Sequence, residues 1–319
     1  MTEFHTPTVL LPGGGGAAAV CALKSLRMAG FQGRIISTDA DPLSAGLHLA
    51  DGHATLPRVT EPDFFDRALE VIKQEKVTLI LPTSGFDILV YSRKKSHLEN
   101  LGVKVIMSDY PTIENCIDKW QFYQIARDSF PMPRTTLDRD NRVCFPCFVK
   151  PIRGKGSRGA VRCGDASELE HHLAHRSDLL IQEYLPGEEF SIDVLSDLKG
   201  QPLVAVPRVR LATKDGISFK GRIVADLEIQ NHCMQLAHFL KLKGPSCMQM
   251  KRGEDGRAKF VEVNPRMGGG SIFTTLAGIN IASLSIAIAC GQAVTIPPFH
   301  EITVLRYYEE ITLNGKGAK

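Results

Sequence analysis

The sequence lacks the features that would indicate a nucleic-acid, secreted or membrane protein. Its 38 basic and 35 acidic residues leave a net charge of +3, which is too balanced to indicate nucleic-acid binding. The first residues, MTEFHTPTVLLPGG, have no basic segment before a short apolar run, so we expect no signal peptide. The longest apolar stretch, residues 272–290, includes two Thr, two Ser and one Asn and predicts a buried helix. We therefore expect a cytoplasmic protein that binds small molecules, with no nucleic acid and no membrane as partner.

The sequence also lacks the usual patterns of metal and nucleophilic sites. Its ten histidines include no HExxH pair, and its eight cysteines are scattered through the chain. The segment CFPC, Cys144 to Cys147, has the spacing of a metal or redox site, but no second CxxC accompanies it. Reduced, buried thiols are therefore expected, and no Ser–His or Cys–His arrangement for nucleophilic catalysis is apparent.

The first third of the chain alternates strands and helices. Residues 9–11 predict a strand, residues 13–16 a glycine turn, residues 17–28 a helix, and RIISTDAD a second strand. The same alternation continues to KVIMSD and predicts a doubly wound parallel sheet over residues 1–110. Gly13, Gly14 and Gly16 fit either a dinucleotide loop or a structural turn, and the sequence leaves both open.

A second region begins after a helix predicted over YPTIENCIDKWQFYQIARDSF, which ends before the prolines at 131 and 133. The following strand carries Lys150, and a loop containing Gly154, Gly156 and Gly159 comes next. The loop also carries Arg153, Lys155 and Arg158, and glycines beside basic residues favour binding of a polyphosphate. The loop does not open a helix through GKS or GKT, so it is not a Walker loop.

The segment KFVEVNPRMGGGS places polar residues at alternate positions of a predicted strand. Glu262, Asn264 and Arg266 share one face if the alternation holds, and the valines at 261 and 263 occupy the other. A hairpin turn at residues 254–255 would place Gln249 opposite residue 260 and on the same face as Glu262. The arrangement fits either a half-solvated strand or a row of oxygen ligands with a cation for a charged group.

Five segments taken together resemble the ATP-grasp superfamily, and most closely its carbamoyl-phosphate-synthetase-like branch, which includes small carboxylate–amine ligases that act on amino acids. The segments occur in family order: DKW, FVKPIRGKGSRGA, IQEYLPGEEFSIDVL, CMQM and FVEVNPRMGGGS. The resemblance implies an α/β and α+β fold: a Rossmann-like pre-ATP-grasp domain over residues 1–110 and an ATP-grasp domain over 111–319. A lid subdomain is expected at about 134–185.

The resemblance also implies roles for individual residues. The expected ATP-binding residues are Lys119, Lys150, Arg153, Gly156, Ser157, Gly159, Glu183, Tyr184, Leu185, Glu189 and Gln249. The expected metal ligands are Glu262, Asn264 and Gln249, although a neutral Gln weakens the case for two metals. Arg266 and Lys150 are the expected catalytic residues. Arg208, Arg210 and Gly268, Gly269 and Gly270 are candidates for the substrate site, with a solvated strand edge and a plain turn as alternatives.

The resemblance implies an ADP-forming ligase that uses ATP and Mg²⁺, with Mn²⁺ as a substitute, to activate a carboxylate as an acylphosphate for attack by an amine. A homodimer is compatible with it. Activation of bicarbonate is the alternative within the family. A regulatory nucleotide-binding subunit and a dinucleotide-dependent oxidoreductase, the latter resting on PGGGG alone, are alternatives of other classes.

Overall fold

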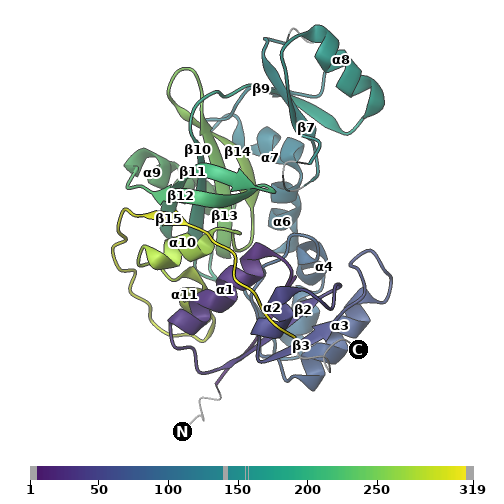
Figure 1. The fold of residues 1–319 in the computed structure, drawn as a ribbon, viewed down its shortest axis with the longest axis vertical. Coiled ribbons are helices and arrows are strands. Elements are labelled where there is room, and N and C mark those ends of the chain that lie inside the picture. The colour runs from purple at the N-terminus through teal and green to yellow at the C-terminus, as the bar shows by residue number, and fades with distance from the viewer. Residues whose placement is uncertain (1–5, 139–142, 155, 157, 314–319) are drawn as a thin grey trace.

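The computed structural model describes residues 6–138, 143–154, 156 and 158–313. Three sheets follow one another along the long axis of the molecule (Figure 1). The strands are β1 Thr8–Pro12, β2 Arg34–Asp39, β3 Gly52–Thr55, β4 Leu79–Ile80, β5 Lys104–Val105, β6 Thr135–Thr136, β7 Cys147–Pro151, β8 Val161–Cys163, β9 Leu179–Glu183, β10 Glu189–Ser196, β11 Pro202–Lys214, β12 Ile217–Ile223, β13 Gly244–Arg252, β14 Ala258–Asn264 and β15 Thr303–Leu305. The helices are α1 Ala17–Met28, α2 Ala45–Leu49, α3 Phe64–Gln74, α4 Ile88–Arg93, α5 Lys95–Asn100, α6 Tyr110–Ile117, α7 Lys119–Ala126, α8 Ala166–His175, α9 Leu227–Phe239, α10 Ser271–Leu276 and α11 Ile281–Ala289.

The N-terminal sheet is parallel, with strand order β3-β2-β1-β4-β5, and it confirms the predicted doubly wound α/β class. Its central strand β1 alternates between two hydrophobic cores: Val9 and Leu11 pack with α1, and Leu10 packs with α3. Strand order reverses between β1 and β4, so the loops after these strands meet at the switch point where ligands of open α/β sheets bind.

The second sheet is antiparallel and has six strands, in the order β14-β13-β10-β11-β12-β15. Helix α9 packs on β10 and β11, and the core between them contains Ile192, Cys233 and Met248. The stretch before Asp226 contains β12. This strand alternates between buried and exposed residues and pairs with β11.

The third sheet is small and antiparallel, in the order β6-β9-β7-β8, with α8 on one face. Strands β7 and β8 form an antiparallel hairpin, and the loop between them carries the glycine and basic residues predicted to follow Lys150. This sheet lies at the end of the molecule opposite the N-terminal sheet (Figure 1), with the six-stranded sheet between the two.

Two of the predicted helices are each divided in the structure. The helix predicted across residues 110–130 breaks at Asp118, whose extended backbone ends α6 and whose side chain caps α7 by accepting from the amides of Trp120 and Gln121. The apolar stretch 272–290 forms α10 and α11 rather than one helix, with Gly278 between them at a positive φ of 111°. Among the residues described, no helix is long and apolar enough to cross a membrane.

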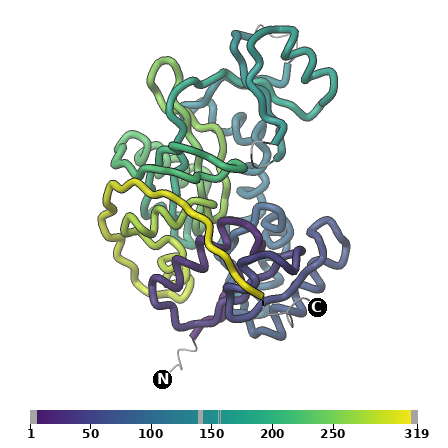
Figure 2. Tube along the Cα trace, viewed as in Figure 1, coloured from purple at the N-terminus to yellow at the C-terminus, as the bar shows by residue number. Residues whose placement is uncertain are grey.

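The C-terminal segment leaves β15 and runs across α1 toward the N-terminal sheet (Figure 2). Arg306 donates to the carbonyl of Gly269 at 2.5 Å, and Glu309 pairs with Lys24 of α1 at 3.0 Å. The segment therefore ties the N-terminal helix α1 to the loop that precedes α10.

Candidate functional site

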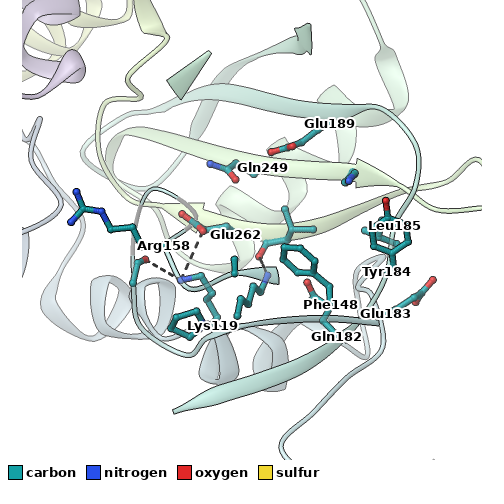
Figure 3. Close-up of a pocket in the computed structure, with 16 residues that line it drawn as sticks. Lys119, Phe148, Arg158, Gln182, Glu183, Tyr184, Leu185, Glu189, Gln249 and Glu262 are labelled. Carbon is teal, nitrogen blue, oxygen red and sulfur yellow. Dashed lines mark hydrogen bonds and ion pairs between the residues drawn. The ribbon is translucent and has the colours of Figure 1, made fainter. Parts of the chain in front are cut away.

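A cavity lies between the small sheet and the β13–β14 edge of the six-stranded sheet, with about 800 Å³ of empty space, part of it open to solvent. Figure 3 shows Glu189, Gln249 and Glu262 on strands of the six-stranded sheet, facing Phe148 and Gln182 on the small sheet. Most of the residues predicted to bind ATP therefore meet around one cavity. Those that line it are Lys119, Lys150, Glu183, Tyr184, Leu185, Glu189 and Gln249, and the predicted metal ligand Glu262 lines it as well.

The two lysines predicted to hold phosphates are buried in this cavity and come from different elements. Lys119 is the first residue of α7, and its ammonium donates to Gly154 O at 3.1 Å and lies 3.9 Å from Glu262. Lys150 sits near the end of β7 and donates to Val261 O at 2.9 Å. Burial lowers the pKa of Lys150 to about 8; Glu262 and Glu189 oppose this shift, and the neighbouring charge of Lys119 adds to it. Two buried ammonium groups whose hydrogen bonds go to backbone carbonyls rather than to carboxylates are suited to a polyphosphate.

The strand carrying Glu262 departs from the predicted alternation. Gln249 pairs with Glu262 and Met250 with Phe260, so Val261 is an extra residue in β14. The predicted pairing of Gln249 with Phe260 is therefore wrong, although Gln249 and Glu262 do face the same cavity. The bulge lets Phe260 and Val263, three residues apart, both point into the core, and it leaves Val261 lining the cavity instead of joining Val263.

The polar groups of Glu262, Asn264 and Arg266 contact one another. Asn264 Nδ2 donates to Glu262 Oε1 at 2.7 Å, and Arg266 Nη2 donates to Asn264 Oδ1 at 3.3 Å, although Arg266 lies beyond the end of β14. With Gln249 they offer one carboxylate and two amide oxygens, and the described residues contain no group of three acidic, His or Cys side chains that could hold a metal alone. Such a donor set fits Mg²⁺ that takes further oxygens from nucleotide phosphates and from water.

The glycine loop reaches this region only in part. Arg158 and Gly154 line the nucleotide cavity, and Gly156 lines a neighbouring cavity. Arg153 turns outward to Glu114 at 2.5 Å and Asp118 at 3.1 Å, so the structure places it outside the cavity lining. Gly159 has a positive φ of 71° and packs against the Arg176 side chain. Ser157 and Lys155 lie outside the described residues.

The segment predicted to pair with adenine connects the small sheet to β10. The amide of Glu183 donates to Arg134 O, whereas the amide of Leu185 has no hydrogen-bond acceptor among the residues described. The Glu183 carboxylate binds Lys259 at 2.6 Å and points away from Lys119 (Figure 3). Backbone groups, rather than the Glu183 side chain, thus remain available for a base.

Glu189, the predicted ribose ligand, is ion-paired with Arg210, whose side chain is only 6% exposed and also donates to Gly216 O at 2.7 Å. Arg210 is therefore buried and does not lie on a solvated strand edge, which is the alternative to a role in the site. It orients Glu189 at the rim of the nucleotide cavity.

A second, larger cavity adjoins the first, with about 2040 Å³ of empty space that is partly open to solvent. Gln249 and Glu262 line both cavities, and Asn264 and Arg266 line the second. Its other wall comes from the N-terminal domain and includes residues 56–60 and 83–87. The predicted metal ligands therefore stand between a nucleotide cavity and a second chamber.

The loop Gly268–Gly270 and Arg208 form part of the floor of this second cavity. The amides of these three glycines have no acceptor in the described part of the chain, so they can bind an anion. Arg208 is 1% exposed and pairs with Asp193 at 2.8 Å, which excludes the solvated strand edge considered above. Cys247 also lines the cavity, but burial raises its pKa to about 12, so it stays a neutral thiol.

The N-terminal glycine loop is held by the protein itself. The amides of Gly13 and Gly14 donate to Thr38 O, and the amide of Gly15 donates to Asp39 Oδ2 at 2.8 Å. These bonds occupy the amides and the acid that a dinucleotide would need, and they support the structural-turn interpretation.

Sequence reasoning missed three residues that support the site: Asp193, Thr274 and Arg306. Asp193 and Thr274 bind Arg208, and Arg306 binds the glycine loop. Asp193 stands inside a run of strand residues and Arg306 follows β15, so no local pattern indicates what either side chain contacts.

Comparison with known proteins agrees with this geometry. Residues 175–311 match the family described as ATP-grasp in the biosynthetic pathway with Ter operon, and residues 10–106 match the PylC-like N-terminal domain. The chain carries an ATP-grasp domain. Its ATP-grasp fold is shared with the biotin carboxylase from Campylobacter jejuni in its complex with β-γ-ATP. The TM-score is 0.73 and the identity is 15%, and the match covers 92% of this chain and 73% of that one.

Another ATP-grasp structure is similar: the biotin carboxylase domain of Hydrogenobacter thermophilus 2-oxoglutarate carboxylase, with MgADP and bicarbonate. It has a TM-score of 0.71 and 18% identity over 90% of this chain and 70% of that one. The carbamoyl phosphate synthase large chain of Methanobrevibacter smithii is 25% identical over an alignment of 315 residues that covers 85% of this chain. The chain spans only 28% of the length of that relative.

Proposed function

We propose that this ATP-grasp protein is an ADP-forming ligase that phosphorylates a carboxylate and passes the acyl group to an amine. The observation that carries the proposal is the shared wall of the two cavities. Gln249 and Glu262 face the nucleotide cavity on one side and the second cavity on the other. A γ-phosphoryl group at this wall would lie next to an acid bound in the second cavity.

The residues have separable roles in the proposed reaction. Lys119 and Lys150 bind and orient the phosphates of ATP. Glu262 and Asn264, with Gln249, would hold Mg²⁺, which when bound neutralises phosphate charge. Arg266 donates to the transferring phosphoryl group, whose oxygens gain charge in the transition state. Mn²⁺ in place of Mg²⁺ stays a prediction.

The bonds change in two steps. A carboxylate oxygen of the acid attacks the γ-phosphorus while the bond to the β-phosphate oxygen breaks, which gives the acylphosphate and ADP. The amine then attacks the acyl carbon, inorganic phosphate leaves, and the amine gives up a proton. No side chain needs to act as a nucleophile, in keeping with the neutral Cys247 thiol.

The size of the second cavity favours an organic acid over bicarbonate. Its cavity volume of about 730 Å³ exceeds what an anion of four heavy atoms fills, and Leu56, Val59 and Phe64 give it an apolar side. Bicarbonate remains the second candidate, because similar proteins include carbamoyl phosphate synthases and a biotin carboxylase domain solved with bicarbonate.

ADP and phosphate release should be measured with ATP, Mg²⁺ and a panel of organic acids, each with and without amines, alongside bicarbonate. An active acid labelled with heavy oxygen in its carboxylate should pass one label to the released phosphate. AMP and pyrophosphate as products, or phosphate without label, would refute the mechanism. ADP formation with bicarbonate alone would select the second candidate.

The domain division at residue 110 and the lid at about 134–185 also remain proposals. They are supported by the parallel sheet, whose last strand ends at Val105, and by the small sheet, which runs from Thr135 to Glu183. The homodimer is likewise a proposal, and one similar biotin carboxylase domain was solved as a dimer.

A further inference from the structure

A buried charge pair lies beneath the second cavity. Asp193 on β10 and Arg208 on β11 are 2% and 1% exposed, and their Oδ2 and Nη1 atoms lie 2.8 Å apart. Thr274 of α10 joins them by donating to Asp193 Oδ2 at 2.6 Å. Arg208 pairs directly with Ser191 in the sheet, so Asp193 is its diagonal neighbour on the same face.

Three glycines leave space for this pair. A Cβ atom on Gly268 would lie 2.6 Å from Asp193 Oδ1, and one on Gly270 would lie 2.5 Å from Arg208 Nη2. A Cβ on Gly221 would lie 3.0 Å from Arg208 Cδ. The glycine loop that lines the cavity therefore rests directly on the two charged groups.

The hydrogen bonding of the pair is incomplete. Arg208 Nε and Asp193 Oδ1 are buried without a hydrogen-bond partner among the described residues, and Arg208 Nη2 has none there either. A buried ion pair is a poor source of stability, because removing two charges from water costs about as much as their attraction returns. An arginine that lines the cavity with donors unused is better explained by an anionic ligand.

We propose that Asp193 is a positioning residue that aims Arg208 at the anion in the second cavity and neutralises its charge while the cavity is empty. The proposal rests on the proposed function, in which an acid enters and phosphate leaves through this cavity. Through Asp193, Arg208 is held in place by Nη1 and keeps Nη2 for the ligand, while Nε is buried. The neutralisation weakens the hold on phosphate, so that the product can leave.

The test is titration of inorganic phosphate into the nucleotide-free protein, followed by calorimetry. Asp193→Asn keeps the shape of the side chain but removes its charge, so phosphate should bind roughly tenfold more tightly. The gain should vanish in the double variant Asp193→Asn, Arg208→Met, which isolates this site from the lysines of the nucleotide cavity. Asp197→Asn is the matched control, since Asp197 caps the turn after β10 and lies outside both cavities.

A purely structural role for Asp193 predicts weaker or unchanged phosphate binding. Folded Asp193→Asn protein without a gain, or with a gain that persists in the double variant, would overturn the proposal. If Asp193→Asn does not fold, Gly270→Ala decides, because its methyl group displaces Arg208 Nη2. Phosphate should then bind at least threefold more weakly to Gly270→Ala than to Gly269→Ala. The methyl group of Gly269→Ala would meet only ordinary contacts at 3.5 Å or more. Equal affinities would overturn the proposal.

The titration is independent of turnover. If no acid supports ADP formation, the proposed function fails, whereas the phosphate affinities still decide the role of Asp193.

Discussion

Raising the pH above 8 should release ATP from the folded protein through Lys150. This ammonium is buried, and its pKa is lowered from 10.5 to about 8, first by burial and also by the charge of Lys119. About nine tenths of the Lys150 side chains are then charged at pH 7 and about one tenth at pH 9. A neutral amine cannot donate a charge-assisted hydrogen bond to phosphate.

The magnitude follows from linkage between proton and nucleotide binding. A polyphosphate next to Lys150 favours the ammonium, so the pKa of this group rises when ATP binds. Between the pKa values of the free and bound protein, the Kd for ATP should rise about tenfold for each pH unit. Because half of the Lys150 side chains are already neutral at pH 8, the rise from pH 8 to 9.5 amounts to roughly 16-fold, within the range of about 1.5–3 kcal/mol expected for one hydrogen bond to a charged group.

Unfolding through Lys150 cannot explain weaker ATP binding at high pH, because the contribution of Lys150 to the free energy of unfolding changes in the stabilising direction as the pH rises. The pKa of Lys150 is lower in the folded protein than in the unfolded chain, so between pH 8 and 10.5 the unfolded chain binds more protons. The contribution of Lys150 to the free energy of unfolding therefore increases with pH in this window, by up to about 3 kcal/mol.

Calorimetry with Mg²⁺ and a non-hydrolysable ATP analogue between pH 7.5 and 9.5 would measure this dependence, since phosphate groups with a second pKa of about 6 are already ionised there. Lys150→Met should bind weakly at every pH, and Lys150→Arg should lose the pH dependence because arginine stays charged. A flat profile for the unmodified protein, or the same slope in Lys150→Met, would refute the reasoning.

Two further variants test other parts of the structure. Glu262→Gln should lower Mg²⁺-dependent ADP formation by orders of magnitude while leaving the melting temperature nearly unchanged, because it removes the one carboxylate of the proposed metal site. Glu254→Gln in the neighbouring turn is the control. Near-normal turnover of Glu262→Gln would exclude Glu262 from the site. Asp39→Ala should lower the free energy of unfolding by about 1–2 kcal/mol, because it leaves the Gly15 amide without its acceptor, and NAD should not stabilise either protein. Urea denaturation measures the first effect, and protection from thermal unfolding by NAD would contradict the structural role of the loop.

The residues that could be predicted from sequence are those whose position follows from local rules. Strand β1 and helix α1 follow from periodicity and from the glycines that flank them, and Lys150 follows from its place just before the glycine loop. Alternation places Glu262 and Asn264 on one face of β14, whereas the hairpin pairing predicted for Gln249 is wrong because of the bulge at Val261, although Gln249 still faces the same cavity.

What could not be predicted depends on contacts between distant segments. Arg208 lies in an ordinary strand sequence, and nothing near it shows that Asp193 and a helix 66 residues away will enclose its guanidinium. Arg153 belongs to a loop that looks suited to phosphate, yet Glu114 and Asp118 of the preceding helices draw it outward. The break at Asp118 was missed because the same residue types are tolerated inside a helix and favoured at its cap.

The bulge at Val261 decides which face of β14 the oxygen donors occupy. If the chain kept its length but alternated regularly from Phe260, Glu262 and Asn264 would turn into the core and Val263 into the cavity. Removing Val261 itself would instead restore a regular ladder in which Glu262 still lies opposite Gln249 and faces the cavity. A deletion of Val261 should thus keep the oxygen donors on their face, and its main loss would be the carbonyl that accepts from Lys150.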